Sequence, residues 1–367
     1  MDNLSLLKVL KCKNYRGFQL EEIHYIKEQQ CNMWLLSHPK SGAQVAFLDS
    51  DDTEKTFSMS FKTIPQNDTG VFHIIEHNLV LTGSRSYPSK YWPGRKVLHS
   101  FHSGFTMRGT SMYPVSSCDE SSFQTLVRLY VDGIFSPLLV DSDLPFLREG
   151  WHYQFDEEGN LGYSGIVYSE MKACEENPEF MLHELQLKAA YPGTSFAYHM
   201  GGAPEAIPSL TYQELKETYQ KTFVPENCLI YVNGNTCLAS VLDTLDGYLV
   251  RYPKTGKSFS VDGTPKPWNG KASIYSYPLL EGENPSGRDM ISFNWYIGQN
   301  PECAIAADIL AEVLRPSRKI FWLSGQFTGG MCHRRGCCRK INSRYWWGLY
   351  CAGAPDTRKE PPLSHRS

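Results

Sequence analysis

Apolar and polar residues alternate with a period of two between Cys31 and Thr63. The clearest run alternates apolar with polar side chains in the order Phe57, Ser58, Met59, Ser60, Phe61 and Lys62. This period is typical of a strand with one buried face. We therefore predict that two or three antiparallel strands open the domain.

Several later segments have a helical pattern instead. An apolar helix is predicted over about residues 70–81, and an amphipathic helix over about residues 120–135. The apolar face of the second helix consists of Phe123, Leu126, Val127, Tyr130 and Ile134. Helix returns from about residue 165 to residue 190, where Asn177-Pro178 predicts a cap and a first-turn proline between two helices.

Short turn and cap signals indicate the remaining predicted elements of the first 250 residues. Glu158-Gly159-Asn160 indicates a hairpin turn, and Cys228 to Val232 indicates a short buried strand. Another helix begins at Thr211, whose hydroxyl can pair with Glu214 in a capping box. Strands and helices are interleaved without a glycine-rich phosphate loop, which favours a mixed α/β or α+β layer over a nucleotide-binding doubly wound sheet.

The chain divides into four predicted parts. Residues 1–250 form one domain, and residues 251–272, rich in Lys, Pro, Gly and Ser, form a linker. Residues 273–314 begin a second strand-helix pattern, with Ile291, Phe293, Trp295 and Ile297 alternating. Residues 315–367 have the period of neither helix nor strand, so we expect this atypical tail to be disordered or translated out of frame.

Composition excludes several classes of protein. The 367 residues include 36 Lys+Arg and 39 Asp+Glu, a formal charge of -3, which argues against a protein that coats nucleic acid or an anionic membrane. A hydrophobic share of 41% excludes general disorder. No apolar run approaches the roughly 20 residues of a membrane helix. We therefore expect a soluble globular chain.

The segment His73-Ile74-Ile75-Glu76-His77 is the most informative for chemistry. On a helix, His73 and His77 share a face, so both imidazoles can bind one Zn²⁺. Glu76 lies close enough to reach a water at such a site and to take its proton. Two histidines on a surface helix are usually only solvated, but here the flanking residues are apolar, and buried imidazoles need partners. The motif therefore predicts two zinc ligands and a base.

A catalytic zinc needs a third protein ligand from elsewhere in the chain. Glu170 is the best candidate, because it lies in the segment Gly165–Lys172, which starts a helix after a strand. Glu175, Glu176 and Glu179 compete with it, although each is more typical of a solvated carboxylate. Spacing alone does not decide which of these four carboxylates is the third ligand.

Six stretches of the chain, in order, resemble the pitrilysin/insulinase family of zinc peptidases, in the branch of the presequence proteases and falcilysin. They are GVFHIIEH, LTGSRSYP, MYPVSS, FLREGWHYQF, GIVYSEMK and MGGAPEAIPSLTYQELKETY. In that family the two histidines and a Glu about ninety residues later bind zinc. The resemblance thus implies Glu170 as third ligand and Glu76 as general base, with Gly201-Gly202 as a structural turn near the cleft.

The resemblance also implies the architecture and the substrate. It predicts a two-layer α+β domain with a six-stranded, mainly antiparallel sheet, repeated four times in two halves that close around a chamber. Unfolded peptides would bind by adding a strand to a sheet edge beside the zinc. The chain corresponds to an N-terminal fragment of this architecture, so it would need a complementary C-terminal half or a second subunit as a partner.

Two departures from the family pattern affect the expected activity. The family stretch Phe-x-Asn-Ala-x-Thr, which lines the substrate, corresponds to Phe101–Thr106, where Ser103 replaces Asn. We take Ser103, Gly104 and Thr106 as substrate-binding candidates, and the preceding Tyr91–Arg95 segment should break any helix. The second departure is the tail, where a small metal knuckle at Cys332-His333 and Cys337-Cys338 is disfavoured.

Two functions remain after this comparison. The favoured one is a zinc metalloendopeptidase acting on short unfolded peptides, weakly active because oxyanion-stabilising groups of the second half are missing. The alternative is a non-catalytic peptidase-like subunit or inactive fragment. An unrelated metal-binding scaffold is a third hypothesis, and it would require the ordered matches to be a coincidence. The 11 cysteines, an odd number at irregular spacing, and the lack of a targeting signal favour the cytoplasm. The mitochondrial matrix or another organelle is the alternative.

Overall fold

The computed structural model describes residues 1–88, 97–259, 274–276, 284, 290–296, 302, 305–306, 309–310, 339–342 and 346–352. Backbone contacts divide the chain into two compact units. The first comprises residues 1–172 and 193–264, and the second comprises residues 173–192 and 265–367. The predicted domain ranges stay predictions, and the predicted helix break at Tyr91–Arg95 lies outside the described residues.

The first unit is built around one large sheet, with strand order β1-β2-β3-β10-β4-β7-β5 and β6 also paired to β7. Its strands are β1 (Gln19–Ile26), β2 (Cys31–His38), β3 (Ala43–Asp49), β4 (Lys55–Thr63), β5 (Phe101–His102), β6 (Phe105–Met107), β7 (Gly109–Ser117) and β10 (Cys228–Asn233). All pairs are antiparallel except β10 with β3. The predicted six-stranded sheet therefore gains two short strands, β5 and β6, which together form one interrupted edge.

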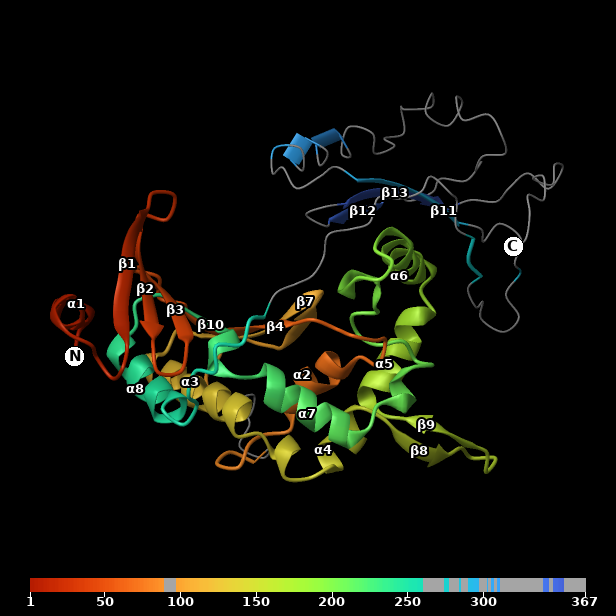
Figure 1. The fold of residues 1–367 in the computed structure, drawn as a ribbon, viewed down its shortest axis with the longest axis horizontal. Helices are drawn as coiled ribbons and strands as arrows, with labels where there is room; N and C mark the ends of the chain where they lie inside the picture. The colour runs from red at the N-terminus through yellow and green to blue at the C-terminus, as the bar shows by residue number, and fades with distance from the viewer. Residues whose placement is uncertain are drawn as a thin grey trace. The chain divides into compact units, whose positions relative to one another are not determined.

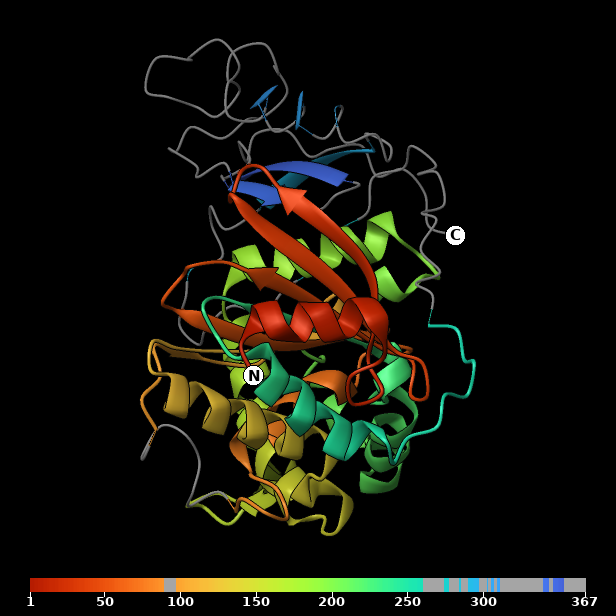
Figure 2. The ribbon, with the colours of Figure 1, turned by 90° about the vertical axis from the view of Figure 1, so that its left-hand side faces the viewer.

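Helices cover one face of this sheet, as Figures 1 and 2 show. The helices of the unit are α1 (Asn3–Cys12), α2 (Val71–Leu81), α3 (Glu120–Phe135), α4 (Leu144–Glu149), most of α5 (Ile166–Glu175), α7 (Tyr212–Thr222) and α8 (Leu238–Leu249). A two-stranded hairpin, β8 (His152–Phe155) with β9 (Leu161–Ser164), stands between α4 and α5. The predicted two-layer α+β architecture is confirmed.

The core lies between the helices and the sheet. On β4, Phe57, Met59 and Phe61 are at most 1% exposed, whereas Ser60 and Lys62 between and beyond them are more accessible. The neighbouring strands place Tyr113 and Ile230 opposite Met59, so apolar side chains from three strands meet in register. The two-residue alternation in the sequence therefore marks the helix-covered face.

Local signals explain where several elements begin. The Asn177 side chain caps α6 (Pro178–Ala190), and Thr211 with Glu214 forms the predicted capping box of α7. The turn at residues 158–160 joins β8 to β9 as predicted. In contrast, α1, α4, α8 and strand β1 were not predicted. Helix α4 has a first-turn proline, Pro145, but its six residues are too few to show a helical period, and α8 begins without a side-chain cap.

The second unit contains α6 and a three-stranded sheet in the order β11-β13-β12. Strand β11 (Met290–Tyr296) coincides with the predicted alternation that begins at Ile291. Strands β12 (Arg339–Asn342) and β13 (Trp346–Ala352) lie within the tail that we expected to lack regular structure. They pair antiparallel, so backbone hydrogen bonding supplies order there without an apolar period in the sequence.

Truncation of Phe57 tests the position of the core. Phe57→Ala should lower the free energy of unfolding by about 3–5 kcal/mol, because it leaves a cavity beneath the helices. Leu229→Ala on neighbouring β10 is the control, since Leu229 is 48% exposed and should change stability much less. Urea unfolding followed by circular dichroism measures both. Equal losses for the two variants would contradict this assignment of the sheet faces.

Candidate metal centre

Helix α2 carries the HxxEH segment and is held from both sides. Its inner face is buried in the core, where Ile74, Ile75 and Leu79 have no exposed surface. Gly70 precedes the helix in the left-handed region (φ 66°), and a side chain there would overlap the Gly201 carbonyl. Gly202, also at positive φ (97°), packs directly against Gly70. These glycines bring the Gly201 loop close to the first turn of α2.

The side chains of His73, His77 and Glu170 converge on one point. One nitrogen of each imidazole and one carboxylate oxygen all lie within 4.8 Å of one another. Glu170 Oε2 is 3.8 Å from His73 Nε2 and 3.6 Å from His77 Nε2. Of the four acidic candidates, Glu170 is therefore the one that the structure brings to the histidines.

The other nitrogen of each imidazole has its own partner. His73 Nδ1 lies 3.1 Å from the Gly201 carbonyl oxygen, and His77 Nδ1 lies 3.2 Å from Glu149 Oε2. Because a carbonyl and a carboxylate oxygen can only accept, we assign the proton to Nδ1 of each ring. The lone pair on each Nε2 then faces Glu170, as a metal ligand requires.

Glu149 is a functional candidate that the sequence analysis missed. It ends the short helix α4, is 2% exposed, and also accepts a hydrogen bond of 2.8 Å from Arg148 Nε. A buried carboxylate that accepts from the ring nitrogen opposite the ligand nitrogen fixes the orientation of the ring and raises its basicity. Its only sequence signal was its place in the FLREGWHYQF stretch.

Two more glycines set the spacing between Glu149 and Glu170. Gly150 follows α4, and Gly165 (φ 144°) precedes α5. A side chain on Gly165 would overlap the Gly150 carbonyl, so the end of α4 and the start of α5 touch through backbone alone. Burial of Val167 and Met171 then anchors α5 with Glu170 toward the histidines.

Burial and neighbouring charges change the pKa values at this cluster. Burial, with the nearby His77, lowers the pKa of His73. Burial also lowers the pKa of His77, but its hydrogen bond to Glu149 and the charges of Glu76, Glu149 and Glu170 outweigh that, and the net pKa is raised. Burial raises the pKa of Glu76 to about 7, with His77 opposing and the other two carboxylates adding to the rise. A carboxyl group with such a pKa is suited to proton transfer near neutral pH.

The edge strand formed by β5 and β6 lies against Glu76. Gly104, at the interruption between them, leaves no room for a side chain, because a Cβ there would overlap Glu76 Oε1. The Ser103 amide donates to the Pro114 carbonyl at 3.1 Å, and Thr106 Oγ1 lies 3.5 Å from the Phe72 carbonyl on α2. The three substrate-binding candidates therefore line the sheet edge beside the metal cluster.

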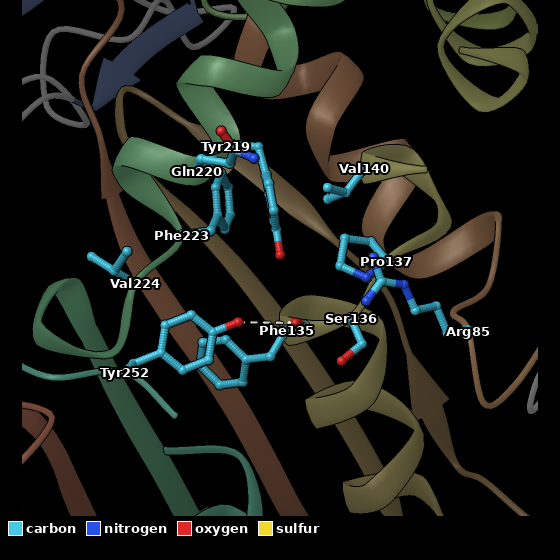
Figure 3. A pocket seen from close by; sticks show the side chains of 10 residues that line it. All are labelled: Arg85, Phe135, Ser136, Pro137, Val140, Tyr219, Gln220, Phe223, Val224 and Tyr252. Atoms are coloured by element: carbon cyan, nitrogen blue, oxygen red, sulfur yellow. Dashed lines mark hydrogen bonds between the residues drawn. The ribbon is translucent and has the colours of Figure 1, made fainter. Parts of the chain in front are cut away.

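A separate cavity of about 280 Å³ lies between α3, α7 and the segment after α8 (Figure 3). Its walls are mainly aromatic and aliphatic and include Phe135, Tyr219, Phe223 and Tyr252. At its rim, the guanidinium of Arg85 is already paired with Asp141. None of its lining residues belongs to the metal cluster, and it lacks metal-ligating side chains, so we place the chemistry at the cluster.

No model of a protein family matches the chain. It is similar to presequence protease 1, chloroplastic/mitochondrial, from Arabidopsis thaliana, with 32% identity over 84% of this chain and 30% of the relative. A mitochondrial presequence protease from Drosophila melanogaster is 33% identical over 73% of this chain and 26% of its own length. The chain thus spans about a third or less of these relatives.

Structural similarity agrees with the sequence comparison. The crystal structure of pitrilysin matches 92% of this chain and 36% of its own chain, with a TM-score of 0.58 and 15% identity, which shows a shared fold. No helix in the described ranges is both long and apolar enough to cross a bilayer. The chain belongs to the pitrilysin/insulinase family, in the branch of the presequence proteases.

Proposed function

We propose that the chain is a zinc metalloendopeptidase that hydrolyses short unfolded peptides. The observation that carries this proposal is the convergence of His73 Nε2, His77 Nε2 and Glu170 Oε2 on one point beside Glu76. Two imidazoles with one carboxylate are a ligand set typical of catalytic zinc, which keeps a fourth position open.

The spacing of these donors fits a zinc ion. Ligand bonds of about 2.0–2.1 Å in a tetrahedron separate neighbouring donors by about 3.4 Å. The distances of 3.6 and 3.8 Å to Glu170 need only small side-chain adjustments to reach that value. His73, His77 and Glu170 would hold the ion, and Glu149 and the Gly201 carbonyl would keep the two rings in place.

The residues of the site would have different chemical roles. Bound zinc would polarise a peptide carbonyl and lower the pKa of a water to about 7. Glu76 takes the proton of the attacking water and passes it to the leaving amine. Because Glu76 is 7% exposed and touches Gly104, its carboxylate has little freedom to leave that position.

The peptide would bind along the outer edge of β5 and β6. Their inner edges already pair with β7, so the amide and carbonyl groups of the opposite edge are available to an added strand. This binding mode favours unfolded peptides, because a folded protein cannot offer a free strand. Ser103, Gly104 and Thr106 would contact the residues nearest the cleaved bond.

A non-catalytic peptidase-like subunit is the second candidate. It is favoured by Ser103 at the position of the family's Asn. The complete set of His73, Glu76, His77 and Glu170 favours the enzyme. A complementary half or second subunit would then raise a weak basal activity.

The compartment is a separate proposal. The names of the Arabidopsis and Drosophila relatives place those proteins in chloroplasts or mitochondria. They favour the organellar alternative over the cytoplasm for this chain. Expression with a C-terminal fluorescent tag in cells of the source would distinguish the two.

Ligand substitutions test the metal. The purified chain should hold about one zinc per molecule by elemental analysis, and His73→Ala or Glu170→Gln should lose most of it, because two ligands bind far more weakly than three. His24→Ala is the control, since His24 is exposed and pairs with Glu22 away from the metal cluster. A zinc-free chain, or one that keeps its zinc in both variants, would rule out this site.

Substitution of Glu76 separates metal binding from catalysis. Glu76→Gln should keep zinc but cleave a fluorogenic peptide about 100- to 10,000-fold more slowly, since the amide cannot accept the proton. Glu28→Gln, at an exposed position, serves as the control. Cleavage by Glu76→Gln at the rate of the unmodified chain would show that another group is the base, and the absence of cleavage by every form would favour the non-catalytic subunit.

Substitution of Glu149 tests the orientation of His77. Glu149→Ala should weaken zinc binding about 10- to 100-fold, and Glu149→Gln less, because its amide oxygen can still accept from Nδ1. Competition with a chromogenic chelator measures both affinities. The idea fails if Glu149→Ala binds zinc as tightly as the unmodified chain.

A further inference from the structure

Two histidines outside the metal cluster contact each other at the edge of the large sheet. His99 lies just before β5, and His102 is the last residue of that strand. Their ring centres are 4.5 Å apart, and the ring planes cross at 77°. The rings of His73 and His77 have nearly the same arrangement, with centres 4.9 Å apart and planes at 85°. A second pair of imidazoles therefore resembles the pair in the candidate metal centre.

The segment that carries this second pair is fixed against β7. The carbonyl of Leu98 accepts a hydrogen bond of 2.7 Å from Ser117 Oγ, and the amide of Ser100 donates to the Ser116 carbonyl at 2.9 Å. His102 is itself paired with β7 in the sheet. The backbone thus holds both rings in position before any ligand binds, which lowers the entropy lost on binding.

The hydrogen bonds of the two rings leave ligand nitrogens available. His99 Nδ1 lies 3.0 Å from the Val97 carbonyl oxygen, and since a carbonyl oxygen can only accept, we assign the proton to Nδ1. The lone pair of His99 is then on Nε2, and a hydrogen bond from the other ring nitrogen to a carbonyl is typical of metal-binding histidines. His102 makes no hydrogen bond or ion pair with any other described residue, so either of its nitrogens can bind an ion.

Ring spacing and ligand type together select the kind of ion. Metal–nitrogen bonds of about 2.0–2.1 Å place the ring centres about 5 Å apart at a tetrahedral ion and about 4.5 Å apart where the ligands meet at about 90°. The observed 4.5 Å fits the second case, which is the geometry of Cu²⁺ and Ni²⁺. Neither ring has an ion pair with a carboxylate in the described part of the chain, and this disfavours Ca²⁺ and Mg²⁺.

We propose that His99 and His102 form a second metal site, which binds Cu²⁺ or Ni²⁺ and leaves the remaining coordination positions to water. Both side chains are partly exposed, so an ion and its waters can reach them. Neither histidine lies in the six stretches that resemble the peptidase family, and the family pattern Phe-x-Asn-Ala-x-Thr has no fixed residue at the position of His102. The site is therefore separate from the zinc ligands.

An ion at this site would lie on the strand along which the peptide is proposed to bind. Gly104, two residues after His102, is the position that touches Glu76. Bound metal would add charge and volume beside this edge and so hinder an added strand. This effect on the peptide rests on the proposed function, whereas the binding of the ion does not.

Nickel binding tests the site. The probe is NiCl₂, titrated by calorimetry at about pH 7.5, where imidazoles are mostly neutral. The protein is the untagged full chain with His73→Ala and Glu170→Gln, and its accessible thiols are alkylated, so that neither the metal cluster nor cysteines compete. Adding His99→Ala or His102→Leu should raise the Kd at least about tenfold, because one imidazole remains. Electron paramagnetic resonance with Cu²⁺ should show two coupled nitrogens before either substitution and one after it.

His152→Ala is the matched control. The Nδ1 of His152 also donates to a carbonyl, that of Leu147 at 2.8 Å, but this ring contacts no second imidazole among the described residues. The control should leave the Kd and both coupled nitrogens unchanged, and circular dichroism checks that every variant is folded. Equal Kd values in all variants, or an equal loss with His152→Ala, would overturn the inference. Because the assay uses a chain without its zinc ligands, a failure of the proposed peptidase activity would leave the result intact.

Discussion

Crowding of three carboxylates around two imidazoles is the constraint on which the site depends. Glu76 and Glu149 are almost fully buried, and Glu170 approaches both histidines. Burial removes the water that would stabilise the charged form of Glu76, and the charges of Glu170 and Glu149 add to this effect, so the pKa of Glu76 is raised. A divalent cation would reverse this cost by pairing with Glu170 and both Nε2 atoms. The arrangement therefore makes physical sense as a metal centre.

Close contact between backbones is what allows such crowding. Gly70 against Gly201-Gly202 brings a carbonyl to His73, and Gly150 against Gly165 brings two carboxylates to His77. A side chain at Gly165 would separate α4 from α5 and move Glu149 and Glu170 apart. The large sheet contributes the other half of the site, since its edge at Gly104 closes over Glu76. The fold therefore determines the geometry of the site at glycine positions where the neighbouring backbone leaves no room for a side chain.

The sequence predicted local features well and long-range ones poorly. The alternation around Met59, the capping box at Thr211 and the HxxEH segment each depend on residues within one turn or strand, and all lie where expected. Spacing alone left Glu170 among four candidates, because its distance to His73 depends on the packing of α5. Glu149 was missed for the same reason. Its role arises from the contact between α2 and α4, which no local pattern encodes.

The central claim concerns the metal and its ligands. X-ray absorption at the zinc edge on the purified chain tests it most directly. The account predicts one zinc bound by nitrogen and oxygen at about 2.0–2.1 Å, with the imidazole scattering of two histidines. Sulfur ligands at about 2.3 Å would place the metal on cysteines instead and contradict the account.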